Sequence, residues 1–281
     1  MPDPVRLLAT LRRAIVLTRD TPGRTGRLVT LGDAADVLVA GDLHGHVGNF
    51  QVLLRNADLK GHLRRHLVLQ EVIHSPYRYP QGGDKSHQLL DLYAALKCQF
   101  PERVHLVMGN HELAQWTGRQ IIKDDEDFNE LFSDGVRQAY GPHADEVYAA
   151  YLELFGILPL ALRTPNRCFI SHSVPSAKYL HDFKLTVLAA DNVPSEAFLP
   201  KGPLYGLVWG RDTTLPHVEA FLRKVDADWL ISGHIQCDEG FTIPNDRQII
   251  LDAAGAPAAY CLFPADRPLS REEQLGCIRL I

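Results

Sequence analysis

Short apolar runs alternate with amphipathic segments along most of the chain. In the amphipathic segments apolar residues recur at helical spacing, as Val47, Phe50, Leu54 and Ala57 do, which predicts helices. The apolar runs have the length of strands and end in polar or turn residues. The predicted strands cover residues 26–32, 35–42, 64–71, 103–112, 227–235 and 258–264, the last of them closing the fold. The predicted helices cover residues 1–25, 46–59, 86–100 and 216–225.

Turn residues separate these elements. Residues 74–86 are rich in Pro and Gly, which predicts a loop, and Ser86 at its end can cap the following helix. Pro165 and Asn166 divide an apolar stretch over residues 159–173, which predicts a hairpin.

The remaining segments fit the same organisation. A second hairpin is predicted across residues 244–248, and about forty residues after 112 are largely helical in pattern. Within them, the polar run 123–130 is interpreted as a solvated face or loop. No repeat or long polar linker interrupts the pattern, so we expect a single α/β domain over residues 1–281.

Composition narrows the class of protein. The 281 residues are 46% hydrophobic and 22% charged, with a net charge of -5, which is typical of a globular protein and gives no basic footprint for nucleic acid or an anionic membrane. No apolar run approaches the roughly 20 residues that span a bilayer. The five cysteines are scattered and form no C-x-x-C pair, which argues against a disulfide framework and favours a cytoplasmic setting.

Polar side chains with metal-binding chemistry follow five of the apolar runs. They are Asp42 with His44, Glu71, Asn110 with His111, His172 and His234. Each has an ordinary explanation alone, since an Asp can cap a helix and an Asn can serve a turn. The ordered series favours a shared site, because ligands of α/β sheets bind beyond the carboxyl ends of the strands.

The chemistry of this set suits divalent cations. Carboxylate, amide and imidazole groups without thiolates favour borderline metals such as manganese, iron or zinc. One metal rarely uses so many protein ligands while keeping an open position. Two metals sharing one carboxylate would use them all, and such a pair activates water and clamps a phosphoryl group.

The motifs also resemble a known family. "GDLHG" at 41–45, "GNHE" at 109–112, an isolated strand-end His and "SGH" at 232–234 are similar to the metallophosphoesterase superfamily, in its phosphoprotein-phosphatase-like branch. The similarity spans roughly residues 35–262. It implies a β-sandwich flanked by helices, one domain, and two divalent metal ions, with manganese expected first and iron or zinc as alternatives.

The resemblance also implies roles. Asp42 and His44 would hold the first metal, and Asn110, His172 and His234 the second, while His111 would be the general acid. Gln236 stands where the phosphodiesterase branch carries a second His, which favours a phosphomonoesterase or a polyphosphate hydrolase.

The second motif of the family, G-D-x-x-D-R-G, is altered. Glu71 stands at the position of the bridging Asp, His74 at that of the acidic partner of the catalytic His, and Ser75 at that of the Arg. Asp84 is a rival for the bridging carboxylate, but Glu71 follows a better strand. For the missing phosphate-gripping Arg, Arg211 in "LVWGRD" is the first candidate and the alternatives are Arg78 and Lys85.

These observations predict a metal-dependent phosphatase in which a metal-bridging hydroxide attacks phosphorus and His111, tuned by His74, assists the leaving group. The substrate would be a protein Ser/Thr phosphate or a small phosphoester. The alternatives are a dinucleoside polyphosphate hydrolase and a non-catalytic scaffold that binds a phosphorylated partner. The physiological substrate, the metal and the oligomeric state are left open by the sequence.

Overall fold

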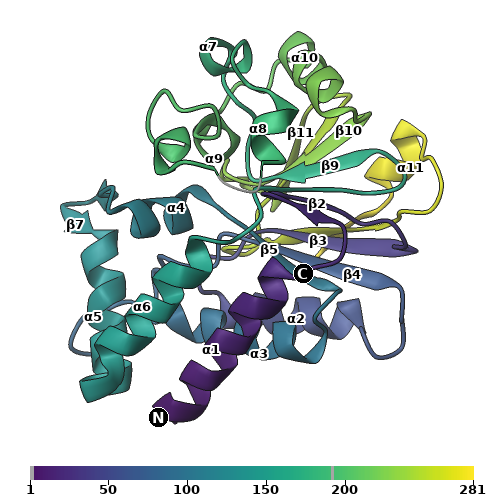
Figure 1. Ribbon diagram of the computed structural model, residues 1–281. Helices are drawn as coiled ribbons and strands as arrows, with labels where there is room; N and C mark the ends of the chain where they lie inside the picture. The colour runs from purple at the N-terminus through teal and green to yellow at the C-terminus, as the bar shows by residue number, and fades with distance from the viewer. Residues whose placement is uncertain (1–2, 191–192) are drawn as a thin grey trace.

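Side chains of the central strands alternate between two buried layers. A computed structural model describes residues 3–190 and 193–281, and in it Val37 and Val39 join one apolar cluster while Leu38 and Ala40 join another. Successive strand residues face opposite sides of a sheet, so the first cluster fills the space between two sheets and the second lies beneath the outer helices. Figure 1 shows these layers, with helices on both outer faces. The expected α/β sandwich flanked by helices is therefore confirmed.

The first sheet is mixed and contains both predicted hairpins. Its strand order is β1 (Arg24–Thr25), β2 (Leu28–Thr30), β8 (Ala161–Arg163), β9 (Cys168–Ser171), β10 (Trp229–Ser232), β12 (Gln248–Leu251) and β11 (Phe241–Asn245). β8 and β9 pair antiparallel around the turn at Pro165 and Asn166, and β11 and β12 pair antiparallel around residues 246–247. β9, β10 and β12 run parallel, so their carboxyl ends lie at one edge.

The second sheet has a parallel centre. Its order is β14 (Ile278–Leu280), β13 (Ala259–Pro264), β3 (Asp36–Asp42), β4 (Arg65–Gln70) and β5 (Val104–Val107). β3, β4 and β5 are parallel, and β13 joins β3 antiparallel. The prediction that residues 258–264 close the fold was wrong, because α11 (Arg271–Leu275) and β14 follow and β14 pairs with β13.

The helices pack on the outer faces of the two sheets. The longer ones are α1 (Pro4–Arg19), α2 (Val47–Ala57), α3 (His87–Gln99), α4 (Asn110–Thr117), α5 (Phe128–Tyr140), α6 (Ala144–Phe155) and α10 (Leu215–Val225). The short ones are α7 (Ala177–Leu180), α8 (Leu185–Leu188) and α9 (Gly206–Trp209), with 3₁₀ turns at Gly141–His143 and Ser195–Phe198. No helix among the described residues is long and apolar enough to cross a membrane.

Several predicted boundaries need correction. The N-terminal helix, predicted over residues 1–25, is capped by Asp3 and ends at Arg19, after which residues 24–25 form β1; residues 1–2 lie outside the described part. The strand predicted over 103–112 ends at Val107, because Asn110 begins α4. The predicted cap at Ser86 was also wrong in its mechanism: Ser86 precedes α3, but its hydroxyl makes no capping bond and serves Asp84 and His74 instead.

The two sheets come together at the carboxyl ends of β3 and β12. There Asp42 and Asp252 form a parallel bridge, and the Ala253 amide donates to the Asp42 carbonyl at 2.9 Å. This junction brings the strand ends of both sheets to one rim, which is where the sequence places its candidate residues.

Candidate metal centre

The predicted ligands come from both sheets. β3 ends at Asp42 and leads into His44, and Glu71 follows directly after β4. Asn110 and His111 form the first turn of α4 behind β5, and His172 and His234 follow β9 and β10. Residues separated by up to 192 positions along the chain thus come into contact.

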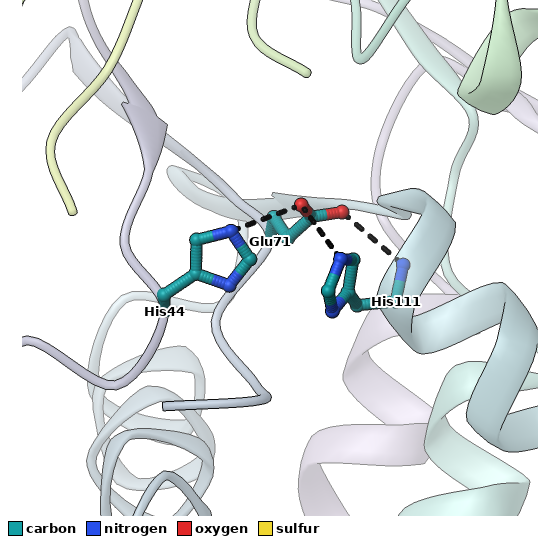
Figure 2. Close-up of side chains that lie close together, drawn as sticks. All are labelled: His44, Glu71 and His111. Carbon is teal, nitrogen blue, oxygen red and sulfur yellow. Dashed lines mark hydrogen bonds and ion pairs between the residues drawn. The ribbon is translucent and has the colours of Figure 1, made fainter. Parts of the chain in front are cut away.

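Glu71 lies between the rings of His44 and His111 (Figure 2). Its Oε1 is 3.3 Å from His44 Nε2 and 3.8 Å from His111 Nε2. Its Oε2 accepts a hydrogen bond from the His111 amide at 3.2 Å and lies 3.1 Å from His172 Nε2. The carboxylate therefore contacts groups from β3, α4 and β9 at once.

A second set of donors surrounds Asn110. The Asn110 Oδ1 lies 2.9 Å from His172 Nε2 and 2.7 Å from His234 Nδ1. Asp42 closes the group from the other side, because its Oδ1 is 3.5 Å from His172 Nδ1 and its Oδ2 accepts from the His234 amide at 2.8 Å. The structure thus brings all six predicted ligands together.

Two glycines of the motifs make room for these carboxylates. A Cβ at Gly109 would lie 2.3 Å from Glu71 Oε2, and a Cβ at Gly233 would lie 2.2 Å from Asp42 Oδ1. Such separations are far shorter than van der Waals contact, so an alanine would displace the carboxylate. Gly109 and Gly233 are therefore needed, because each leaves room for a carboxylate of another motif.

Backbone strain gathers at the same place. His44, Glu71, His74 and His234 have φ values of 40, 41, 63 and 70°. Non-glycine residues rarely adopt this left-handed conformation, and such strain persists where the surrounding structure enforces it, often at functional sites. Local bonds do enforce it here, since the amides of Leu43 and His44 both donate to the Glu71 carbonyl at 2.9 Å.

The buried carboxylates and histidines of the site shift one another's pKa values. Burial raises the pKa of Asp42 to about 7. Burial lowers the pKa of His44, but the hydrogen bond and charge of Glu71 outweigh it and raise the pKa to about 10. Burial also lowers the pKa of His172, but the charges of Glu71 and Asp42 outweigh it and raise the pKa to about 9. Burial also opposes ionisation of Glu71, yet the charge of His172 and hydrogen bonds from His172 and His44 hold its pKa well below the usual range. The carboxylates therefore draw positive charge into this cluster.

The donor set fits divalent cations. Asp42 Oδ1 and His172 Nδ1 are buried and have no hydrogen-bond partner among the described residues, so each has a lone pair or proton that the protein leaves unmatched. Two groups of ligand atoms, one from His44, Glu71 and His111 and one from Asp42, Glu71 and His172, each lie within 4.8 Å of one another. Glu71 belongs to both groups, which is the arrangement that a shared carboxylate requires.

The rival carboxylate, Asp84, serves a different purpose. It is 1% exposed and accepts hydrogen bonds from the amides of Ser75 and Ser86 and from the Ser86 hydroxyl. The Ser86 hydroxyl in turn accepts from the His74 amide at 3.1 Å. Asp84 thus anchors the loop after β4, and of these two rivals Glu71 is the one that lies among the candidate ligands.

His74 contacts the predicted general acid directly. Its Nδ1 lies 2.8 Å from His111 Nδ1, and its Nε2 lies 2.8 Å from Gln115 Oε1. Burial lowers the pKa of His74 to about 4 and that of His111 well below its usual range. The pair is therefore neutral in this form of the protein.

Of the three candidates for binding phosphate, Arg211 is the best placed. It is exposed, lines the cleft above the ligands and donates from Nε to His234 Nε2 at 3.2 Å. Arg78 also lines the cleft, but it lies 3.6 Å from Glu126 and donates to the Ser75 carbonyl. Lys85 lies over the Tyr79 ring, 5.2 Å from its centroid, and does not line the cleft.

Two parts of the site were not predicted from the sequence. The cleft has a volume of about 1030 Å³, and a small hairpin of β6 (Ile122–Lys123) and β7 (Glu126–Asp127) forms one wall. The loop from Asp252 to Pro257 forms another. The polar run 123–130, interpreted as solvated, therefore contributes to the wall of the cleft, and nothing in its local pattern indicates this.

The role of Glu112 was also not predicted from the sequence. It is fully buried, and its carboxylate accepts from the amides of Val72, Ile73 and Gly109 at 2.8, 3.3 and 3.0 Å. It therefore ties the segment that follows Glu71 to the turn that carries Asn110. The motif "GNHE" contains this Glu, but its local sequence does not indicate the contacts with residues 72 and 73.

Comparison with known sequences agrees with this geometry. A family model described as calcineurin-like phosphoesterase matches residues 35–238. A probable serine/threonine-protein phosphatase of Encephalitozoon cuniculi is 26% identical over 236 residues, covering 77% of this chain and 46% of the relative. Serine/threonine-protein phosphatase 5 of Solanum lycopersicum is 27% identical over 260 residues, covering 81% and 41%. The chain thus spans less than half the length of these curated relatives.

Solved structures share the fold. A protein serine/threonine phosphatase of Saccharomyces cerevisiae superimposes with a TM-score of 0.71 at 16% identity, covering 100% of this chain and 89% of the yeast chain. A cold-active protein-tyrosine phosphatase of a Shewanella species gives a TM-score of 0.59 at 16% identity, covering 85% and 78%.

Proposed function

The chain belongs to the calcineurin-like phosphoesterase family, and from this premise we propose that it is a metal-dependent phosphatase that hydrolyses phosphomonoesters. The observation that carries the proposal is the convergence of six ligand groups from both sheets around Glu71, which contacts His44, His111 and His172. Family membership implies divalent metal ions, and we propose two of them, with manganese as the first choice.

Each side chain has a defined part in this proposal. Asp42 and His44 would hold one cation, and Asn110, His172 and His234 the other, with Glu71 shared between them. His44 is suited to this role because its Nδ1 lies 2.9 Å from the Ile73 carbonyl, which can only accept. The proton of neutral His44 therefore sits on Nδ1, and the lone pair of Nε2 faces Glu71. When bound, the cations would supply a hydroxide nucleophile near neutral pH and neutralise charge on the phosphoryl oxygens.

Arg211 and His111 would act on the substrate itself. Arg211 is exposed at the cleft, where its planar guanidinium can hold two phosphoryl oxygens. His111 Nε2 faces the cleft beside Glu71 and, once protonated from solvent, would give that proton to the leaving oxygen, with His74 holding its ring from behind.

The substrate class follows from the relatives. They are named serine/threonine-protein phosphatases, so we propose protein Ser/Thr phosphate or a small phosphomonoester as substrate. The five cysteines are all within the described residues and are free thiols, which supports a cytoplasmic setting.

The first experiment combines metal analysis with hydrolysis of a chromogenic aryl phosphate by the full chain. We expect about two equivalents of divalent metal, activity that depends on added manganese, and loss of both metal and activity in Asp42→Asn. Asp58→Asn is a matched control, because Asp58 is an exposed aspartate at the end of α2.

A panel of a phosphoserine peptide, a phosphotyrosine peptide and a dinucleoside tetraphosphate then separates the substrate classes. Faster turnover of the phosphopeptides supports the proposal, whereas preference for the tetraphosphate contradicts it. Bound metal with no turnover of any phosphoester would also contradict it and would favour a phospho-binding scaffold.

A further inference from the structure

A buried glutamine lies behind the two contacting histidines of the site. Gln115, on α4, is 4% exposed and has three polar neighbours. Its amide nitrogen donates to the Tyr148 hydroxyl at 2.7 Å and to the Asn129 carbonyl at 3.3 Å, and its amide oxygen lies 2.8 Å from His74 Nε2.

The orientation of this amide is determined by its surroundings. The Asn129 carbonyl can only accept a hydrogen bond, so the Gln115 nitrogen must face it. Reversing the amide would bring two acceptors together at Asn129 and two nitrogens together at His74. The oxygen of Gln115 must therefore face His74, and His74 Nε2 must be the donor.

This assignment determines the protons of both histidines. A neutral imidazole carries one N–H, and burial keeps His74 neutral. With its proton on Nε2, His74 can only accept at Nδ1, so His111 Nδ1, 2.8 Å away, must donate. The remaining nitrogen of His111, Nε2, faces Glu71 Oε1 and the cleft.

The rings cannot easily turn to escape this arrangement. Phe128 and Phe132 pack edge-on against the His74 ring, with centroids 5.8 and 6.1 Å away. The His74 amide is held by the Ser86 hydroxyl.

We propose that Gln115 is a positioning residue, which acts through the tautomer of His74. With His74 Nδ1 an acceptor, His111 keeps one proton on Nδ1, and a second proton taken from solvent at Nε2 is the one it passes to the leaving oxygen. The effect of Gln115 on turnover rests on the proposed function, but the proton arrangement does not. Two neutral groups, His74 and Gln115, thus stand behind His111 where the altered motif lacks a carboxylate.

The test compares Gln115→Met, which removes the acceptor, with Gln115→Glu, which as the protonated acid keeps an acceptor oxygen toward His74 and a donor toward the Asn129 carbonyl. Long-range ¹H–¹⁵N spectra of the histidine rings in the metal-free full chain report the protonated nitrogen. We expect wild type and Gln115→Glu to show His74 protonated on Nε2 and His111 on Nδ1, and Gln115→Met to lose this pattern. We also expect kcat for an aryl phosphate to fall about tenfold in Gln115→Met with KM unchanged, which is part of the roughly 10²–10⁴-fold that general acid catalysis supplies, and to recover in Gln115→Glu.

Two control variants distinguish a loss of the proton arrangement from a general disturbance of the structure. Tyr148→Phe removes a partner of the same amide but leaves its oxygen on His74, so it should keep the wild-type pattern. Gln99→Met changes an exposed helical glutamine and should change neither readout.

An unchanged ring pattern in Gln115→Met would overturn the proposal. So would the same loss of pattern and of kcat in Gln115→Glu and Tyr148→Phe as in Gln115→Met. If the wild-type chain hydrolyses no phosphoester, the proposed function fails, and the spectra alone decide the proton arrangement.

Discussion

Two groups of buried histidines lie in this molecule, and their pKa values are shifted in opposite directions. In the candidate metal centre, His44 and His172 have pKa values raised to about 10 and about 9. In the second group, His66 on β4 and His105 on β5 stack with centroids 5.4 Å apart, and their ring nitrogens lie 3.0 Å from each other. There burial lowers the pKa of His66 to about 4 and that of His105 well below its usual range.

The difference lies in the carboxylates, since both groups are buried. Glu71 is 2% and Asp42 6% exposed, and they contact the site histidines directly. The acid nearest the second group, Asp33, has an 84% exposed side chain 3.9 Å from His66 Nε2, where water screens it. For these four rings, burial alone keeps His66 and His105 neutral, whereas the hydrogen bonds and charges of buried carboxylates make His44 and His172 positively charged.

Position along the strands separates the groups further. His66 and His105 lie within strands, where the ladder bonds hold the backbone. The site residues lie beyond strand ends, where His44, Glu71 and His234 have positive φ. The paired histidines are therefore structural, and those at the strand ends are free to serve a ligand.

The largest difference should appear when one histidine of each group is replaced by glutamine in separate variants. We expect His172→Gln to lower phosphatase activity by at least about 10²-fold, comparable to the loss of one charge-stabilising group in an active site, and to reduce bound metal. His105→Gln should change kcat less than twofold. Steady-state kinetics and metal analysis of the two variants check this, and equal losses in both would remove the functional distinction between the groups.

Removal of metal should give the next largest effect. A cation at 100 times its Kd stabilises the folded state by about 2.7 kcal/mol, so chelation should lower Tm by roughly 5 °C or more. His105→Gln should keep this response and His172→Gln should lose most of it. Scanning calorimetry with and without chelator measures it, and a full response in His172→Gln would place the stabilising cation elsewhere.

A fall in pH should destabilise the protein through the neutral pair, His66 and His105. The folded pKa of His66, about 4, is below the unfolded value of roughly 6.5, so the unfolded chain binds more protons between these values. Stability is therefore lost as pH falls from 6.5 toward 4, by up to about 3 kcal/mol at 1.36 kcal/mol per unit. His66→Gln should remove much of this loss in denaturant titrations at pH 7 and pH 4.5, whereas His62→Gln, on an exposed histidine, should not. Parallel pH dependence in wild type and His66→Gln would show that the pair does not cause the loss.

How much of the structure the sequence predicts depends on how far apart along the chain the contacting residues lie. Strands, helices and motif ends leave local signals, so the ends of β3, β4 and β10 were located to within a few residues. Gln115 reaches His74 across 41 positions, and Glu112 reaches Val72 across 40. No local pattern records such contacts, and without them Glu112 could only be assigned to its own helix.

The altered second motif shows the same limit. Glu71 could be preferred over Asp84 because it follows a strand, but what Asp84 does instead, holding Ser75 and Ser86, depends on how the loop folds back. The polar run 123–130 was interpreted as a solvated face or loop because charged runs usually lie in solvent, whereas the cleft that the β6–β7 hairpin lines is also lined by residues of α4 and α5.

The smallest effect should follow removal of the exposed acid beside the neutral pair. Asp33→Asn should change the free energy of unfolding by less than about 0.5 kcal/mol at both pH 7 and pH 5, because an exposed ion pair contributes little and the Asp33 side chain is 84% exposed. Denaturant titration of this variant beside His66→Gln measures the contribution. A change of more than 1 kcal/mol at pH 5 alone would mean that a solvated carboxylate can hold a proton on a buried histidine. Burial of Glu71 and Asp42 would then no longer explain why His44 and His172 are charged and the stacked pair is not.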